Sequence, residues 1–169
     1  MLFRSVAQNL LITRAIDKSN IKPLKTLGDL SALTPGVLGT NGITTFDIIS
    51  GVTAKTQPDI LIAIDALCAS SIRRVGCCFQ LSNAGISPGA GVANAQKTLN
   101  ETTLGLPVIA LGVPLMIHAH ALCADGLVPE ASGLVVTPKD IDFYIKICTH
   151  IVSNAINLAV HGEEYFNFL

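Results

Sequence analysis

Charged and aromatic side chains are scarce in this sequence. Only 14% of its 169 residues are Asp, Glu, Lys or Arg, and 5% are aromatic, with no tryptophan. The net charge is −1 and no basic block is present, so the sequence lacks the clustered positive charge that is typical of nucleic-acid-binding proteins. Apolar residues make up 50% of the chain, which indicates a heavily buried sheet, an oligomeric surface, or both.

Paired cysteine motifs and sorting signals are also missing. The odd number of cysteines, five, and the absence of a Cys-x-x-Cys pair favour buried thiols in a reducing compartment. They are Cys68, Cys77, Cys78, Cys123 and Cys148. Arg4 is not followed by an apolar core, so no secretory signal is visible. The uncharged run 107–124 is interrupted by Pro114, which favours a strand and a separate segment over a membrane span. We expect a soluble, cytoplasmic protein.

The chain length favours one domain, 1–169, whose core needs neither disulfides nor metals. The alternation of apolar patterns predicts a three-layer α/β fold with a mostly parallel sheet. Strands are expected at 30–33, 59–64, 76–81 and 107–113, the last of them closed by a proline. Helices are expected at 5–16, at 46–56 and from Thr137 to about His161.

Two helix starts are marked by their capping residues. Thr44 or Thr45 can cap the helix at 46–56, with Asp47 in its first turn, where the helix dipole favours an acid. Thr137 can cap the terminal helix, with Pro138 at its first position. The buried face of the terminal helix is expected to carry Ile141, Ile145, Cys148, Val152, Ile156 and Ala159.

Asp65 is the most informative residue. It follows five apolar residues, 60–64, a run that predicts a fully buried parallel strand. Ligands and chemistry in open α/β sheets lie just outside the carboxyl ends of the strands, so Asp65 is a candidate catalytic residue. The alternative is a strand-end residue that caps the next helix or turn. Asp47 is expected to lie toward the opposite end of the sheet, as a helix-start acid.

Other chemistries find less support. The Gly-rich loop 82–97 lacks the Gly-Lys-Ser/Thr ending of a phosphate loop, so it is expected to shape a pocket or a subunit contact. His118 and His120 could share a metal if extended, but no further ligand follows at a standard spacing. His150 and His161 are expected to be structural, and no Gly-x-Ser-x-Gly elbow exists. We therefore expect no metal and no cofactor.

Several blocks of the sequence, in the right order, resemble the germination protease family of bacterial spores. They lie at 35–49, 58–67, 85–94, 101–114 and 136–142. The resemblance implies a fold similar to hydrogenase maturation proteases and an endopeptidase that degrades small acid-soluble spore proteins. It also implies a zymogen, a homotetramer and a location in the spore core, with two catalytic aspartates and no direct contact with nucleic acid or membrane.

Asp65 matches one of the two family aspartates. In such a pair, one ionised carboxylate can activate water while the other, kept protonated by its neighbour, polarises the carbonyl. The resemblance places the other aspartate before the helix expected at 5–16, so the first strand, this aspartate and the propeptide region are expected to be absent. The loop at the substrate cleft is expected to include Asn83, Gly85, Ser87, Pro88 and Gly89.

The chain also departs from the family pattern. Asn83 and His118 stand where the family carries acids, and the segment between about Cys123 and Val135 is shorter. Two interpretations remain: a fragment of the endopeptidase, or an inactive paralogue that acts as a binding or assembly subunit. A third is a metal-assisted peptidase in which His118 or His120 joins Asp65. A missing first strand would leave a sheet position unfilled.

Overall fold

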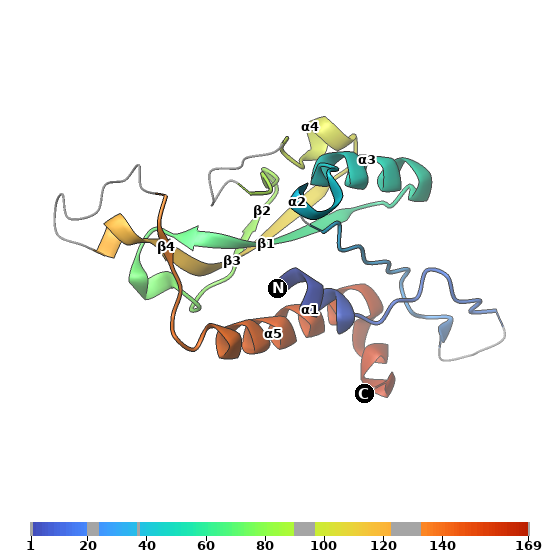
Figure 1. The fold of residues 1–169 in the computed structure, drawn as a ribbon. Coiled ribbons are helices and arrows are strands. Elements are labelled where there is room, and N and C mark those ends of the chain that lie inside the picture. Colours follow the sequence, from blue (N-terminus) through green and yellow to red (C-terminus); the bar gives the residue numbers. More distant parts are fainter. Residues whose placement is uncertain (1, 20–23, 37, 90–96, 123–132, 169) are drawn as a thin grey trace. The chain divides into compact units, whose positions relative to one another are not determined.

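The computed structural model describes residues 2–19, 24–36, 38–89, 97–122 and 133–168 (Figure 1). The chain divides into two compact units, and each is described by itself. Unit 1 combines Met1–Thr34 with Ile145–Leu169, and unit 2 is Pro35–Tyr144. The expected α/β class is confirmed, because helices and a mixed sheet make up the fold.

Unit 2 contains the sheet, whose order is β1-β3-β2. The strand β1, Leu61–Ala69, runs parallel to β3, Val108–His118, over most of its length. Two short strands, β2 at Gln80–Ser82 and β4 at Val135–Val136, pair antiparallel with β3. The sheet is therefore mixed, and its longest pairing is parallel.

The observed strands correct three of the predicted ones. The strand expected at 59–64 continues through Asp65 to Ala69, and the one expected at 76–81 shrinks to Gln80–Ser82. Residues 30–33 form no strand. There, Leu30 bonds to the segment around Thr13 without forming a ladder: its carbonyl accepts from the N–H groups of Thr13 and Arg14 at 3.0 and 3.1 Å, and its N–H donates to Thr13 Oγ1 at 3.0 Å.

Pro114 lies inside β3 rather than at its end. Proline lacks an N–H, so it is tolerated in a sheet at an irregularity. The register supplies one: Leu67 pairs with Pro114, and Cys68 pairs with Met116, which leaves Leu115 without a partner on β1. The Pro114 carbonyl accepts a hydrogen bond from the Gly76 N–H at 2.7 Å. The strand therefore passes the proline through a bulge.

The two long strands differ in burial. The central strand β3 supplies much of the core of unit 2, with Val113 0% and Val108 3% exposed. By contrast, every residue of β1 before Ala69 is half-buried, so the prediction of a fully buried strand was wrong. The physical reason is its place in the sheet: β1 is an edge strand, and β3 is its one sheet neighbour among the described residues.

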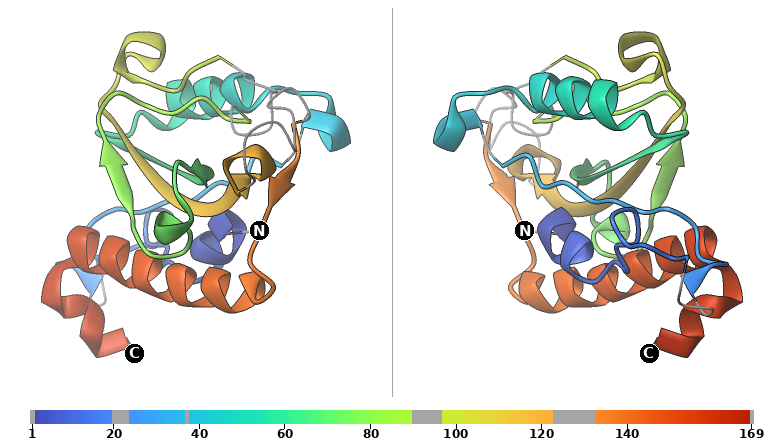
Figure 2. Two further views of the ribbon diagram at one scale, coloured as in Figure 1. Left: turned by 90° about the vertical axis from the view of Figure 1, so that its left-hand side faces the viewer. Right: turned by 90° about the vertical axis from the view of Figure 1, so that its right-hand side faces the viewer.

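The main helix of unit 2, α3 at Thr45–Thr56, begins where the sequence predicts. Thr44 is its N-cap and accepts a hydrogen bond from the Asp47 N–H. The short helices α2, Leu38–Asn41, and α4, Glu101–Leu104, flank it, and Asn100 caps α4 with a reciprocal capping box. Two single 3-10 turns, at Ile72–Arg74 and Ala119–Leu122, follow β1 and β3. Figures 1 and 2 show α3 and α4 on the same side of the strands.

Unit 1 is built from both ends of the chain. Its helix α1, Leu2–Gln8, starts earlier and ends earlier than the expected helix at 5–16. The reason is tertiary: the Leu11 N–H donates to Asn157 Oδ1 at 2.9 Å, and Asn157 Nδ2 donates to the Asn9 carbonyl at 3.1 Å. These bonds to α5 satisfy the backbone that a longer helix would have satisfied internally.

The helix α5, Ile141–His161, ends where the sequence predicts, and a 3-10 segment, Gly162–Phe168, follows it. The predicted start of α5 at Thr137 and Pro138 was wrong: residues 139–140 form a turn, in which the Ile141 N–H donates to the Pro138 carbonyl at 3.2 Å, and the helix begins only at Ile141. Three of the six apolar residues expected on its buried face, Cys148, Val152 and Ile156, are buried, whereas Ala159 is exposed. Polar residues complete that face: Thr149, Ser153, Asn157 and His161. The stretch Ile141–Phe168 is long and apolar enough to cross a membrane by length and composition, a test that core helices of soluble proteins also pass.

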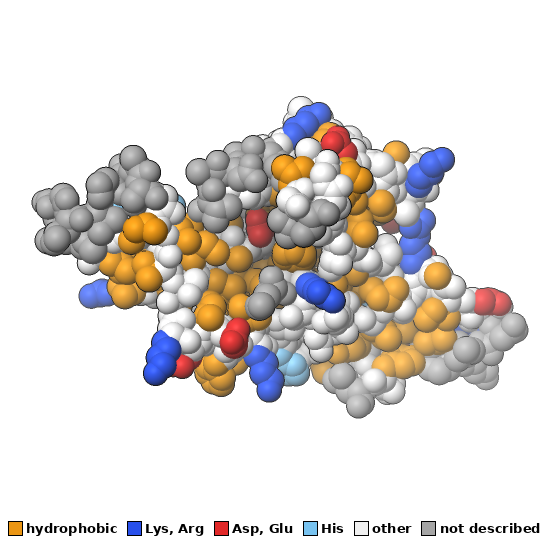
Figure 3. Space-filling view, in the orientation of Figure 1, with side chains coloured by type: hydrophobic (Ala, Val, Ile, Leu, Met, Phe, Trp, Pro, Cys, Tyr) orange, Lys and Arg blue, Asp and Glu red, His pale blue; other side chains and the backbone are white. Residues whose placement is uncertain are grey.

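Apolar side chains are exposed on both units. Figure 3 shows them on one face of the molecule, and among the large ones Leu81 is 70% exposed and Phe143 62% exposed. The expectation of buried thiols holds for Cys148 and fails for Cys77, which is exposed. Cys123 lies outside the described residues.

Candidate active site

Asp65 lies in the middle of β1, four residues before its end, rather than at the carboxyl end of the strand. The sequence predicts the strand end too early, because a charged residue after an apolar run usually marks a strand boundary. In the structure, Asp65 pairs with Gly112 of β3, and Gly112 pairs with Gln80 of β2. Directly paired residues project from the same face of a sheet, so Asp65 and Gln80 flank a glycine on one face.

Gly112 is a glycine for a steric reason. A Cβ atom at this position would collide with the side chain of Leu67, two residues after Asp65 on the same face of β1. Leu67 therefore leans over the glycine and fills the space between the neighbouring side chains.

The electrostatics of Asp65 are set by burial. Desolvation raises the pKa of this carboxyl above its ordinary value, and the hydrogen bond from the Ala66 N–H to Asp65 Oδ1, 2.8 Å long, acts in the opposite direction. In the described part of the chain, no second carboxylate contributes to this shift. Burial of this half-buried acid thus shifts its protonation equilibrium toward the neutral form, relative to an exposed aspartate.

Asp47 has the role that the sequence predicts. The Asp47 N–H donates to Thr44 Oγ1 at 3.1 Å, and the Thr44 hydroxyl donates back to Asp47 Oδ2 at 2.7 Å. The acid completes the cap of α3 and is no partner of Asp65 in this structure.

The Gly-rich loop is tied down at both of its described ends. Ile86 and Leu99 form an antiparallel bridge, and the hydroxyls of Ser87 and Thr98 are 2.7 Å apart. The ammonium group of Lys97 lies 3.9 Å from the ring centroid of Phe46 in α3. Residues 90–96 lie outside the described part of the chain.

The expected cleft residues occupy the first half of this loop. Asn83 is exposed in the bend after β2, and Pro88 is half-buried. Gly85 and Gly89 have φ values of +86° and +78°, the left-handed region that favours glycine. At Gly85 a side chain would also strike the Leu99 carbonyl, so this glycine permits the bridge that closes the loop.

His118 ends β3 and His120 follows in a 3-10 turn. Their rings stack with centroids 5.4 Å apart and an interplanar angle of 19°. No cluster of three or more His, Cys, Asp or Glu side chains suited to a metal occurs among the described residues. The expectation that His161 is structural is confirmed, because it is buried with Nε2 2.9 Å from the Leu11 carbonyl oxygen.

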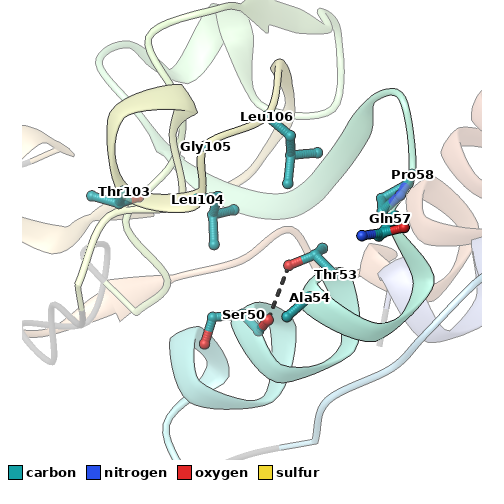
Figure 4. A pocket seen from close by; sticks show the side chains of 9 residues that line it. All are labelled: Ser50, Thr53, Ala54, Gln57, Pro58, Thr103, Leu104, Gly105 and Leu106. Carbon is teal, nitrogen blue, oxygen red and sulfur yellow. Dashed lines mark hydrogen bonds between the residues drawn. The ribbon is translucent and has the colours of Figure 1, made fainter.

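A pocket of about 320 Å³ opens elsewhere in unit 2 (Figure 4). It is lined by Ser50, Thr53, Ala54, Gln57, Pro58, Thr103, Leu104, Gly105 and Leu106. Residues 57–58 lead into β1 and residues 105–106 lead into β3, so the pocket lies where these parallel strands begin. Asp65 does not line it. The sequence does not predict this pocket, because Gln57 and Gly105 are far apart along the chain. The pairing of β1 with β3 brings them to the same pocket.

The family model and the similar proteins point to the same family. The model of the germination protease family matches residues 2–128. The germination protease of Caldanaerobacter subterraneus subsp. tengcongensis is 35% identical over 196 residues, covering 92% of this chain and 60% of the relative. That of Clostridium perfringens (strain SM101) is 34% identical over 199 residues, covering 92% of this chain and 59% of the relative. That of Bacillus cytotoxicus is 46% identical over 121 residues, covering 71% of this chain and 33% of the relative.

The lengths of these alignments are informative. The first two are longer than the chain of 169 residues, so these relatives carry residues within the aligned region that this chain lacks. The chain spans about 60% of the length of the relative from Caldanaerobacter. With matches to the family model and to these relatives over most of its length, the chain belongs to the germination protease family.

Proposed function

We propose that this chain forms part of an aspartate-pair endopeptidase that degrades small acid-soluble spore proteins in the cytoplasm of the spore core. Asp65 is one carboxylate of the pair. The observation that carries the proposal is a half-buried acid inside a strand, with a raised pKa, in a chain of this family. A three-layer fold similar to hydrogenase maturation proteases, a zymogen form and a homotetramer belong to the same proposal.

The chemistry requires a second carboxylate. One carboxylate must be ionised to activate water, and the other must keep a proton to polarise the peptide carbonyl. Burial favours the protonated form of Asp65, so Asp65 suits the second of these tasks. An isolated Asp65 cannot perform both tasks, so residues 1–169 by themselves are expected to be inactive.

The loop 82–97 is proposed to border the substrate cleft. Asn83 follows the end of β2, three residues after Gln80, and Gln80 shares the face of Asp65. The Ile86–Leu99 bridge and the contact of Lys97 with Phe46 hold the ends of the loop against the rest of unit 2. A loop fixed in this way can present backbone and polar groups to an extended peptide.

A second candidate function is a binding or assembly subunit without catalysis. The observation that favours it is that Asp65 has no carboxylate neighbour affecting its pKa among the described residues. Such a subunit would keep the fold and surfaces of the family and would not need an acid at position 65.

The experiment replaces Asp65 by Asn in the chromosomal gene. Degradation of acid-soluble proteins in germinating spores is followed by acid extraction and electrophoresis. Because a general acid or base contributes roughly 10²–10⁴-fold to a rate, we expect degradation to slow by at least about 100-fold. Asp59→Asn is the matched control, since Asp59 is exposed just before the same strand. Normal degradation in Asp65→Asn spores would favour the binding subunit instead.

A further inference from the structure

Two consecutive cysteines, which the proposed reaction does not use, precede β2. Cys77 is exposed and Cys78 is half-buried, and both are free thiols. The Cys77 N–H and the Cys78 thiol both donate to the carbonyl of Arg74, at 3.3 and 3.6 Å. The pair is thus folded back onto the 3-10 turn that precedes it, with one thiol open to solvent.

The segment that carries these cysteines bulges out of the sheet. The Gly76 N–H donates to the Pro114 carbonyl at 2.7 Å, and Gln80 pairs with Gly112 on the same side of β3. On β3 a single residue lies between these two points, whereas residues 77–79 lie between them on the facing segment. Extra residues in a bulge stand outside the ladder, so their backbone can change without loss of a paired residue.

Consecutive cysteines can form a disulfide only as a strained ring. Their Cα atoms are about 3.8 Å apart across a trans peptide, below the range of about 4.4–6.8 Å that is usual for a disulfide. Closing the ring therefore requires the backbone to adjust, and a bulge permits such an adjustment. Strained and exposed disulfides are also the ones that are most readily reduced again. A bond at this place suits a reversible modification rather than a structural crosslink.

Positive charge lies beside the two thiols. Arg73 and Arg74 end the 3-10 turn Ile72–Arg74, and both are exposed. Among the described residues, the one salt bridge joins Lys18 to Asp29, so neither arginine is neutralised in this way. Because positive groups raise the rate at which anionic reactants arrive, the surroundings favour a negatively charged oxidant.

We propose that Cys77 and Cys78 are a site of reversible oxidation by an anionic low-molecular-weight disulfide. This role is independent of the proposed function. The exposed Cys77 thiolate attacks one sulfur of the small disulfide, forms a mixed disulfide and expels a thiolate. The Cys78 thiolate then attacks the Cys77 sulfur, closes the bond between the two cysteines and expels the second thiolate. The expelled thiolates take up the two protons that the cysteines lost, so one disulfide replaces another.

Closing the ring alters the segment that leads into β2. Gln80 follows Cys78 by two residues and pairs with Gly112, which in turn pairs with Asp65. Because the ring requires the bulge to adopt another backbone conformation, the pairing of β2 is expected to change with the oxidation state. The modification would thereby connect the thiol pool of the compartment to the sheet beside Asp65.

One tryptic peptide reports on the site directly. Trypsin releases residues 75–97 as a single peptide, which contains Cys77 and Cys78 and no other cysteine. The purified, reduced chain is incubated with oxidised glutathione, free thiols are blocked with N-ethylmaleimide, and the peptide is analysed by mass spectrometry. We expect the peptide to lose both thiols without gaining glutathione or label, and to regain both thiols in excess reduced glutathione.

Variants test the order of the steps. Cys78→Ser is expected to accumulate glutathione on Cys77, because no neighbouring thiol remains to release it. Cys77→Ser is expected to react more slowly, since Cys78 is half-buried. Arg73→Gln, which keeps the tryptic site at Arg74, is expected to slow the reaction with oxidised glutathione and not with uncharged 2-hydroxyethyl disulfide. The buried Cys148 is the internal control and is expected to stay unmodified.

Hydrogen exchange measures the effect on the sheet, and each outcome decides a part of the proposal. A ring disulfide that forms and reverses, with altered amide exchange in β2 and unaltered exchange in α3, supports it. A peptide that keeps both thiols, or a wild-type chain that stops at the mixed disulfide, overturns the site. A ring that reduced glutathione does not open overturns the reversibility. Unaltered exchange in β2 contradicts the coupling to the sheet, and equal rates in Arg73→Gln contradict the preference for an anionic oxidant.

Discussion

Asp65 occupies a position where strands usually carry apolar or β-branched side chains. Its carboxylate is partly removed from water, and it pairs with Gly112, over which the side chain of Leu67 lies. An acid at such a site costs stability in its ionised form. Features that cost stability persist where function requires them, which is the physical basis for assigning chemistry to this residue.

The first prediction concerns stability and pH. Because burial raises the pKa of Asp65 above 3.8, the folded state binds its proton more tightly than the unfolded state does. Ionised Asp65 therefore destabilises the fold at neutral pH. Asp65→Asn is expected to raise the free energy of unfolding at pH 7, and this gain is expected to shrink as the pH falls through the raised pKa toward 3.8. Urea unfolding at several pH values measures it.

The exposed Asp59, next to the same strand, provides the control for that series. Asp59→Asn is expected to leave the pH dependence unchanged. A variant Asp65→Asn that is less stable than the wild type at pH 7 would contradict the assigned direction of the pKa shift.

The second prediction concerns the glycine beside Asp65. Gly112→Ala introduces a Cβ atom into the side chain of Leu67, and overpacking of this kind typically costs about 1–3 kcal/mol. Adding Leu67→Ala is expected to recover part of that loss, since the two changes share one contact. Gly51→Ala in α3, where a Cβ meets nothing within 4 Å, is the control and is expected to stabilise. Additive losses in the double variant would exclude the steric explanation.

At the scale of elements, local chemistry predicted one helix well and another poorly. The start of α3 follows from the Thr44 hydroxyl and the Asp47 backbone three residues later, a signal contained in the sequence. The end of α1 is decided by Asn157, which lies 146 residues away from Leu11 and captures its backbone. No local pattern around residues 5–16 contains that information.

The third prediction tests the cap of α3. Thr44→Ala removes the acceptor for the Asp47 N–H and is expected to cost roughly 1 kcal/mol in the free energy of unfolding, measured with urea. Thr44→Ser keeps an acceptor at the same place and is expected to retain most of the stability. Equal losses in both variants would mean that the methyl group of the threonine, rather than the cap, matters.

The strands show a similar division. Apolar runs in the sequence predict both β1 and β3. The charge of Asp65 and the missing N–H of Pro114, however, predict that these strands end earlier than they do. Asp65 remains in its strand because an edge leaves its carboxylate partly hydrated, and Pro114 remains because the register shifts beside it. Both exceptions depend on the neighbouring strand. They were not visible in either segment alone.

At the scale of the whole molecule, the two ends of the chain meet in unit 1. Asn157 is 0% exposed and bonds to both Asn9 and Leu11, so it joins the N-terminal segment to α5. This single side chain satisfies one buried donor and one acceptor of the backbone. It explains why a polar residue lies in the apolar stripe of α5.

The fourth prediction follows from that link. Asn157→Ala is expected to cost about 1–3 kcal/mol, because it leaves the Leu11 N–H and the Asn9 carbonyl without partners. Leu158→Ala, on the exposed side of the same helix, is the control and is expected to change stability little. Thermal unfolding followed by circular dichroism measures both. Equal effects of the two substitutions would contradict a specific role for the amide.

The sequence by itself determined the family, the α/β class, the start of α3 and the end of α5, because these depend on residue types and on signals a few positions apart. Only the tertiary structure decided that Asp65 lies within a strand at the edge of the described sheet, opposite a glycine. Pairing between strands sets those properties, and the partners of β1 come from residues more than forty positions away.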